Sequence, residues 1–168
     1  MKKLLSLLRG LAVAAVMLST AGLLYGQELH FTHFNKEDNN LAYNSINTIF
    51  EDSRGYVWIG THKGLSRYDG VRFKNYDKSD LGVASDFVSA ICEDNSGNLW
   101  IGTDKGASIY RYDIDNFISS DSLFPDGARI SEKVYIIKTD SRGVVWLGTR
   151  EDGLYRYDLL QVALNMVY

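Results

Sequence analysis

The apolar residues of this chain fall in short runs that Gly and Asp separate. Between residues 46 and 76 four such runs follow one another: INTIFED, YVWIGT, LSRYD and VRFKNY. Each run has the length of a β-strand and is rich in β-branched and aromatic residues, which strands favour. Because the linkers leave no room for a helix, the pattern predicts a four-stranded antiparallel meander.

The first run does not alternate strictly between apolar and polar positions. Ile46 and Ile49 lie three residues apart, and on a regular strand residues at this spacing point to opposite faces. We therefore expect a sheet that is covered on both faces. The Asp-x-x-Gly segment that follows, from Asp52 to Gly55, fits a type I turn that a Gly with positive φ closes.

The same unit occurs three times. Aligned on their tryptophans, the units are 42 and 46 residues apart, and each contains an Asp six residues before the Trp and a Gly-Thr pair after it. Each unit then reaches Arg-Tyr-Asp, at Arg67, Arg111 and Arg156. A repeat of this length indicates a stacked architecture, and we assign the repeated residues structural roles. They are Trp58, Trp100 and Trp146; Gly60, Gly102 and Gly148; and Asp52, Asp94 and Asp140.

Four-stranded units that are covered on both faces and repeat at this period are β-propeller blades. The sequence thus predicts an all-β, incomplete propeller over residues 27–168, with three four-stranded antiparallel blades at about 43–80, 85–122 and 131–168. The recurrent Trp is expected to pack between blades, with the Gly leaving room beside it. The segment FTHFNKED repeats FKNYDKSD at an offset of 42 residues, which predicts an N-terminal closing strand.

The consensus Asp-x-x-Gly-x-hydrophobic-Trp-hydrophobic-Gly-Thr, followed by Gly-Leu-x-Arg-Tyr-Asp, resembles the two-component-regulator propeller repeat. It lacks the Trp-Asp and Gly-His pairs of WD-type blades and the Gly-Gly of kelch blades. The resemblance covers about residues 29–158, and unit two departs from it at Ala107 and by two residues inserted before Arg111. It implies the extracytoplasmic sensor region of a Bacteroidetes hybrid two-component system, which recognises oligosaccharides from polysaccharide breakdown and signals to a histidine kinase.

Propellers close with about four to eight blades, whereas this sequence holds three units. Residues 159–168, LLQVALNMVY, lack the polar and aromatic alternation expected of a fourth strand in unit three. We therefore expect a truncated receptor fragment, whose missing blades and kinase region would be its partners. The alternative is a small protein that assembles rings from several chains.

The N-terminal segment has the features of an export signal. Lys2, Lys3 and Arg9 precede an uncharged apolar stretch that ends in small residues, Ser19 and Ala21. This pattern predicts a signal peptide over residues 1–26 and a periplasmic or extracytoplasmic location. An uncleaved signal anchor is the alternative. In both cases the membrane is contacted only through this segment.

Composition and motifs argue against several function classes. A net charge of −3 gives no case for nucleic-acid binding. No P-loop, nucleophile elbow or dinucleotide fingerprint occurs, and His30 and His33 are poorly spaced on a strand to share a metal. We expect no enzyme activity, no cofactor and no metal. A secreted propeller enzyme or scaffold, quinoprotein-like or lyase-like, is the alternative.

Ligand binding is expected where the units differ from one another. The Gly turn between the second and third strands varies most, and loops on a rigid scaffold commonly carry function. Plain solvated turns are the alternative for each position. The candidate binding residues are His62 and Lys63 in unit one, Asp104 and Lys105 in unit two, and Arg150, Glu151 and Asp152 in unit three.

Overall fold

The computed structural model describes residues 30–82, 85–123 and 129–158. The predicted signal peptide and the region of a fourth strand in unit three lie outside these residues. The chain divides into two compact units, residues 1–33 and 34–168. Within the described part, no helix combines the length and the apolar character that a bilayer span requires.

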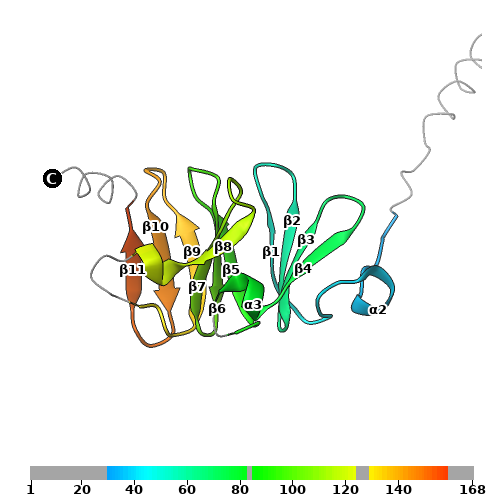
Figure 1. Cartoon of the computed structure of the whole chain (residues 1–168), viewed down its shortest axis with the longest axis horizontal. Helices are drawn as coiled ribbons and strands as arrows, with labels where there is room; N and C mark the ends of the chain where they lie inside the picture. The colour runs from blue at the N-terminus through cyan, green and yellow to red at the C-terminus, as the bar shows by residue number, and fades with distance from the viewer. Residues whose placement is uncertain (1–29, 83–84, 124–128, 159–168) are drawn as a thin grey trace, which may run out of the picture. The chain divides into compact units, whose positions relative to one another are not determined.

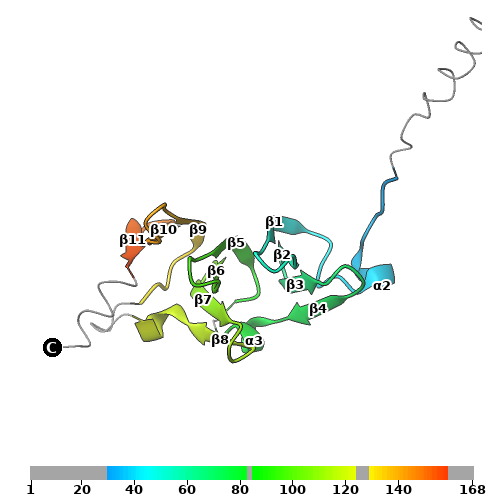
Figure 2. The same cartoon turned by 90° about the horizontal axis from the view of Figure 1, so that it is seen from above.

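Three antiparallel sheets follow one another along the second unit, and Figures 1 and 2 show them in two views. Blade 1 has the order β1 (Ile46–Glu51), β2 (Val57–Thr61), β3 (Gly64–Tyr68), β4 (Phe73–Tyr76). Blade 2 has the order β5 (Val88–Glu93), β6 (Leu99–Thr103), β7 (Gly106–Arg111), β8 (Asn116–Ser119). Blade 3 contains β9 (Val134–Thr139), β10 (Val145–Thr149) and β11 (Leu154–Tyr157) among the described residues. The predicted all-β architecture of successive blades is confirmed.

The first strand of each blade contains a β-bulge, which corrects one step of the sequence argument. The register between β1 and β2 shifts between Ile46 and Thr48, and the other blades shift at the same place. A bulge inserts one residue, so residues three apart come to the same face. In blade 3 both Val134 and Ile137 accordingly reach Gly102 of blade 2. The prediction that Ile46 and Ile49 point to opposite faces was wrong.

The blades pack face to face. β5 lies against β1 and β2 of blade 1, and β9 lies against β5 and β6 of blade 2. The glycines after the tryptophans permit this approach, because a Cβ on Gly60 would lie 2.6 Å from Val88 Cγ1 and one on Gly102 would lie 2.9 Å from Val134 Cγ1. Trp58 and Trp100 are buried in the two resulting cores.

The predicted closing strand is not a strand in this structure: residues 30–35 are irregular, and α2 (Lys36–Asn39) follows them. The second half of this segment nevertheless has the same local form as the second half of the aligned segment 73–80. Asn35 caps α2 as Asp77 caps α3 (Lys78–Leu81), and both helices end in a left-handed residue. The physical reason is that a strand needs a hydrogen-bonded neighbour, and none of the described strands pairs with residues 31–35.

Phe34 shows which position this leader segment, residues 34–40, occupies. Its ring centroid lies 5.3 Å from that of Tyr68 and 5.5 Å from that of Phe73. In the next repeat, Tyr76 of β4 contacts the equivalent rings of blade 2, Tyr110 and Phe117, at 6.3 and 5.1 Å. The leader therefore stands against blade 1 as the last strand of a preceding blade would.

Candidate functional site

The repeated Asp links each first turn to the blade core. Asp52 Oδ1 accepts hydrogen bonds from the N–H groups of Arg54 (2.9 Å) and Tyr56 (3.0 Å), and its Oδ2 accepts one from Trp58 Nε1 (2.6 Å). The same bonds recur in the other blades, where Trp100 and Trp146 donate to Asp94 and Asp140 at 3.1 and 3.2 Å. These residues thus hold the scaffold in place.

Asp140 shows the electrostatic consequence of this arrangement. Desolvation opposes its ionisation. Hydrogen bonds from Trp146 Nε1 and from the backbone N–H groups of Val144 and Arg142 outweigh that effect and lower the pKa of Asp140 to about 2. The turn carboxylate is therefore charged over the physiological pH range and acts as a fixed acceptor.

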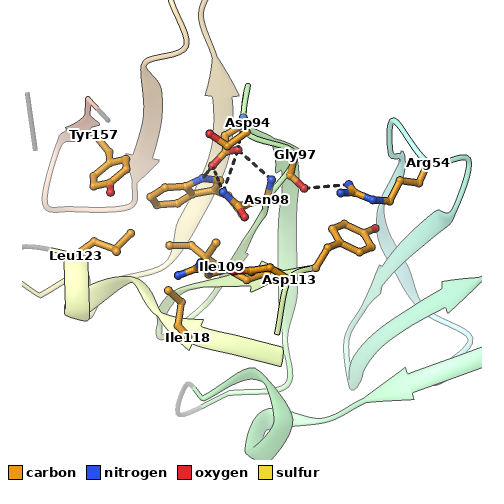
Figure 3. A pocket seen from close by; sticks show the side chains of 13 residues that line it. Arg54, Asp94, Gly97, Asn98, Ile109, Asp113, Ile118, Leu123 and Tyr157 are labelled. Carbon is orange, nitrogen blue, oxygen red and sulfur yellow. Dashed lines mark hydrogen bonds and ion pairs between the residues drawn. The ribbon is translucent and has the colours of Figure 1, made fainter. Parts of the chain in front are cut away.

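A cavity of about 450 Å³ opens on the rim that carries these turns (Figure 3). Antiparallel strands place the first and third turns of a blade at the same end, so residues of both turns of blade 2 meet here. Its apolar wall includes Trp100, Ile109, Ile118, Leu123 and Tyr157. The rings of Trp100 and Tyr157 lie 5.0 Å apart, which brings blade 3 against blade 2 at this wall.

Paired polar groups form the other wall of the cavity. The guanidinium of Arg54 stacks 3.7 Å from the centre of the Tyr112 ring, and its Nη1 donates to the carbonyl of Gly97 at 3.3 Å. Arg111 binds Asp113 through two hydrogen bonds of 3.1 and 2.5 Å. The hydrogen bond from Arg111 lowers the pKa of Asp113, so this carboxyl is ionised.

The inserted residues of unit two explain why the cavity lies beside blade 2. The sequence alignment equated Arg111 with Arg67 and Arg156, but the strand register places Ile109 opposite Trp100, where the other blades have Arg67 and Arg156 opposite their tryptophans. The insertion lengthens the β7–β8 hairpin by one strand pair, Arg111 with Asn116, beyond the Tyr110–Phe117 pair that corresponds to Tyr68–Phe73 of blade 1. Arg111 and Tyr112 therefore extend beyond the position of the other units.

Tyr112 also reaches back across the interface and donates its hydroxyl hydrogen bond to Asp52 of blade 1. Burial, together with this bond to a carboxylate, raises the pKa of Tyr112, which keeps the hydroxyl protonated as a donor. An apolar wall beside fixed donors and acceptors is suited to binding a small polar molecule. Among the described residues, no cluster of three or more His, Cys, Asp or Glu side chains could hold a metal ion.

The seven candidate residues from the sequence lie on the opposite rim and are not gathered at one hollow. The His62 ring lies 4.7 Å from Phe87 and borders a hollow of about 520 Å³, and Lys63 lies 5.1 Å above the ring of Tyr43. Lys105 borders a separate hollow of about 200 Å³.

The remaining candidate residues on that rim interact with neighbours in their own hairpin or, in one case, have a buried atom without a hydrogen-bond partner among the described residues. One Asp104 carboxylate oxygen is buried without a hydrogen-bond partner. In blade 3, Arg150 pairs with Glu151 at 3.2 Å, and Asp152 accepts a hydrogen bond from the hydroxyl of Tyr155. A role for these residues in ligand binding stays a prediction.

Sequence reasoning did not identify the cavity on the other rim. The missed residues are Arg54, Asn98, Arg111, Tyr112 and Asp113. One signal was available, since the two residues inserted before Arg111 are the largest departure of unit two from the repeat. The stacking of Arg54 on Tyr112 joins residues far apart in the sequence, and only the packing of blades brings them together.

The chain matches the family model described as two component regulator propeller over residues 40–63 and 82–105. No curated protein matches its sequence. Its structure resembles the extracellular domain of the hybrid two component system BT4673 from B. thetaiotaomicron, with a TM-score of 0.65 and 25% identity over 79% of this chain and 17% of that chain. It also resembles the corresponding domain of BT3049 from the same organism, with a TM-score of 0.61 and 27% identity over 78% of this chain and 16% of that chain.

The chain thus spans less than one fifth of the length of either solved structure. The matched repeats lie in the first two blades, and both likenesses extend over more than three quarters of the chain. Together they show that residues 40–63 and 82–105 match two-component-regulator propeller repeats and that the fold is similar to the extracellular domains of two hybrid two-component systems.

Proposed function

We propose that this chain is a ligand-sensing part of the extracytoplasmic region of a hybrid two-component receptor and that its ligand is an oligosaccharide. The similarity to extracellular domains of such systems supports the sensor role. The signal-like residues 1–26 are consistent with export. The observation that carries the choice of ligand is the cavity beside blade 2, where the rings of Trp100 and Tyr157 face paired guanidinium and carboxylate groups.

The chemistry of this cavity suits a sugar. Sugars present apolar C–H faces, which pack on rings and aliphatic side chains, and hydroxyl groups, which both donate and accept hydrogen bonds. Asn98, whose amide donates to Asp94 at 3.1 Å, and the Arg111–Asp113 pair offer donors and acceptors side by side. Because the charges of this pair balance, a neutral oligosaccharide fits better than a strongly charged ligand.

Calorimetric titration of the exported chain with a panel of plant and host glycans tests this proposal. We expect one glycan class to bind, and Arg54→Met to weaken binding about ten-fold or more, because it removes the donor to Gly97 and the stack on Tyr112. Arg72→Met, at a side chain that is 85% exposed in the β3–β4 turn, is the matched control. If Lys63→Met weakens binding and Arg54→Met does not, the ligand binds at the Gly-turn rim instead. Absence of binding by every glycan would contradict the choice of ligand.

The location is tested separately. Mass spectrometry of the exported protein should find a mature N-terminus between Gly22 and Gln27, as the small residues before this stretch predict. An intact Met1 on exported protein would favour the signal-anchor alternative.

A further inference from the structure

The residue that pairs with the tryptophan across the sheet differs between the three blades. In blades 1 and 3 it is an arginine, and in blade 2 it is an isoleucine. The pairs are Trp58 with Arg67, Trp146 with Arg156, and Trp100 with Ile109. The next strand continues the difference, because Lys74 pairs with Arg67 and Ile118 pairs with Ile109. Blade 2 therefore has two aliphatic side chains where blade 1 has two cations.

Arg67 shows what fills this place in the first interface. Its guanidinium lies 4.8 Å from the centre of the Tyr56 ring and 5.6 Å from that of Trp58. Its Nη1 donates to the hydroxyl of Tyr110 in blade 2 at 3.0 Å. The Arg67 side chain is only 18% exposed, so a long cationic side chain of the protein itself occupies this part of the interface between blades 1 and 2.

The corresponding place between blades 2 and 3 opens into the cavity on the rim of the Asp turns. The flanking rings match, since the Trp58 and Tyr110 rings lie 5.1 Å apart in the first interface and those of Trp100 and Tyr157 lie 5.0 Å apart in the second. Ile109 lacks the length of an arginine, and it lines the cavity of about 450 Å³. The exchange of arginine for isoleucine thus leaves room that Arg67 takes up in the first interface.

A cation from a ligand is not the expected replacement for this guanidinium. Tyr56, on whose ring Arg67 stacks, is replaced by Asn98 two residues before the tryptophan of blade 2. The cavity is also lined by the guanidinium groups of Arg54 and Arg111. Repulsion from these two charges disfavours a third cation beside them. The place is therefore suited to an uncharged, apolar group.

The apolar surface that reaches the cavity is small. Trp100, Ile109 and Tyr157 are 1%, 3% and 7% exposed, whereas Ile118 and Leu123 are partly exposed. All five belong to the core between blades 2 and 3 or pack against it. Figure 3 shows Ile109, Ile118 and Leu123 on the side of the cavity where Tyr157 lies. A patch with so little open surface is matched in size by one methyl group.

We propose that this patch receives the exocyclic methyl group of a 6-deoxyhexose, and that Ile109, Ile118 and Leu123 select this sugar over its parent hexose. The inference rests on the proposed sugar-binding function of the same cavity. A 6-deoxyhexose carries a methyl group where the parent hexose carries a hydroxymethyl group. Its ring hydroxyls remain free to form hydrogen bonds with the Arg111–Asp113 pair on the other wall.

Selectivity follows from the hydroxyl group that the deoxy sugar lacks. Against the aliphatic side chains of Ile118 and Leu123, the exocyclic hydroxyl of a parent hexose would lose its hydrogen bonds to water without gaining a protein partner. An acetamido group also ends in a methyl, but its polar amide adjoins that methyl and would enter the same apolar patch. We therefore expect the deoxy sugar to bind about ten-fold more tightly than its parent.

Calorimetric titration of the exported chain with matched methyl glycosides tests the proposal. The pairs are L-fucose with L-galactose and L-rhamnose with L-mannose, whose members differ only in the exocyclic hydroxyl group. We expect the deoxy member of one pair to bind about ten-fold more tightly. Ile118→Thr keeps the β-branched shape, places a hydroxyl in the patch and should reduce this ratio to about two-fold or less. Ile114→Thr, at a side chain that is 52% exposed in the β7–β8 turn, is the matched control and should leave the ratio unchanged.

A second variant guards against a change in folding. Leu123→Ser alters the other partly exposed side chain of the patch and should lower the ratio in the same direction as Ile118→Thr. Circular dichroism of both variants should match that of the unaltered chain. A preference for the deoxy sugar that both variants leave unchanged would overturn the role of these side chains.

The remaining outcomes separate this inference from the proposed function. Equal binding of both members of each pair, weakened in each case by Arg54→Met, would keep a sugar in the cavity and overturn the selection of a methyl group. Tighter binding of N-acetylgalactosamine than of galactose, lost in Ile118→Thr, would assign the patch to an acetamido group instead. Absence of binding by every sugar would overturn both the inference and the proposed ligand.

Discussion

Replacing Gly60 or Gly102 by Ala measures how tightly the blades are packed. The added Cβ would lie 2.6 Å from Val88 Cγ1 in the first case and 2.9 Å from Val134 Cγ1 in the second. Carbon atoms normally approach to about 3.5–4.0 Å, so the facing blades must separate or the Val side chains must leave their rotamers. Such overpacking costs about 1–3 kcal/mol.

A compensating effect acts on the unfolded chain. Neither glycine has a positive φ, so Ala can adopt the native backbone, and the loss of unfolded-state freedom stabilises by about 0.4–1 kcal/mol. The expected net loss in the free energy of unfolding is about 1–2 kcal/mol for each variant. Gly60→Ala combined with Val88→Ala should cost less than the two changes added, by about 0.5 kcal/mol or more.

Gly148→Ala is the matched control, because no further blade among the described residues packs against this repeat position. The new Cβ would lie 2.8 Å from Cγ2 of Ile136, and this side chain is 51% exposed and can turn away. The expected change is within about 0.5 kcal/mol. Urea unfolding followed by tryptophan fluorescence measures the free energy of unfolding of all three variants. Equal effects at the three glycines would refute the reasoning from blade contacts.

Three further predictions concern the turn network. Trp58→Ala and Trp100→Ala should each cost about 3–5 kcal/mol in urea unfolding, and Trp146→Ala should cost less because it is half-buried; equal losses would contradict this order. Tyr112→Phe should cost about 1.5 kcal/mol by removing the hydrogen bond to the carboxylate of blade 1, and an unchanged unfolding midpoint would argue against that bond. Since the pKa of Asp140 falls to about 2 in the folded state, its stabilising effect is complete above pH 4 and disappears as the pH falls toward 2; Asp140→Asn should flatten this dependence in acid titrations.

The strand pattern and the repeat were readable from the sequence because both depend on local spacing. The runs around Trp58, Trp100 and Trp146 became β2, β6 and β10, and the turns between strands lie where Gly and Asp predicted them. The β-bulge could not be predicted from the sequence, since no residue type in Ile46–Glu51 marks the position of an extra residue. It emerges from how the first strand must curve to place two aliphatic side chains on one neighbour.

The candidate cavity could not be predicted from the sequence for a different reason. Arg54 and Tyr112 come from different blades, and their 3.7 Å stack depends on packing that no local pattern encodes. The hydrogen bond between the turn Asp and the Trp indole was likewise hidden, although both residues were visible at a constant spacing of six. The distinction between repeated and variable positions directed attention to the Gly turns, whereas the cavity is lined by repeated residues such as Asp94 and Trp100 as well as by variable ones. The role of the Gly-turn residues in binding stays a prediction.

Between blades 1 and 2, Ser53 donates two hydrogen bonds to the Glu93 carboxylate, at 2.8 and 2.6 Å, and the guanidinium of Arg54 lies 3.8 Å from it. This contact on the blade rim has a consequence for how chains of such repeats evolve. The apolar contacts between blades are nearly interchangeable, so a duplicated or deleted unit would still find a neighbour that fits its core. The rim is less permissive: a unit with Ser-Arg favours a follower with Glu, whereas Asn-Ser is followed here by Thr. A chain whose units were reordered would therefore keep the apolar packing between blades but lose the polar matches on the rim. A few side chains on the rim thus determine which order of units is favourable.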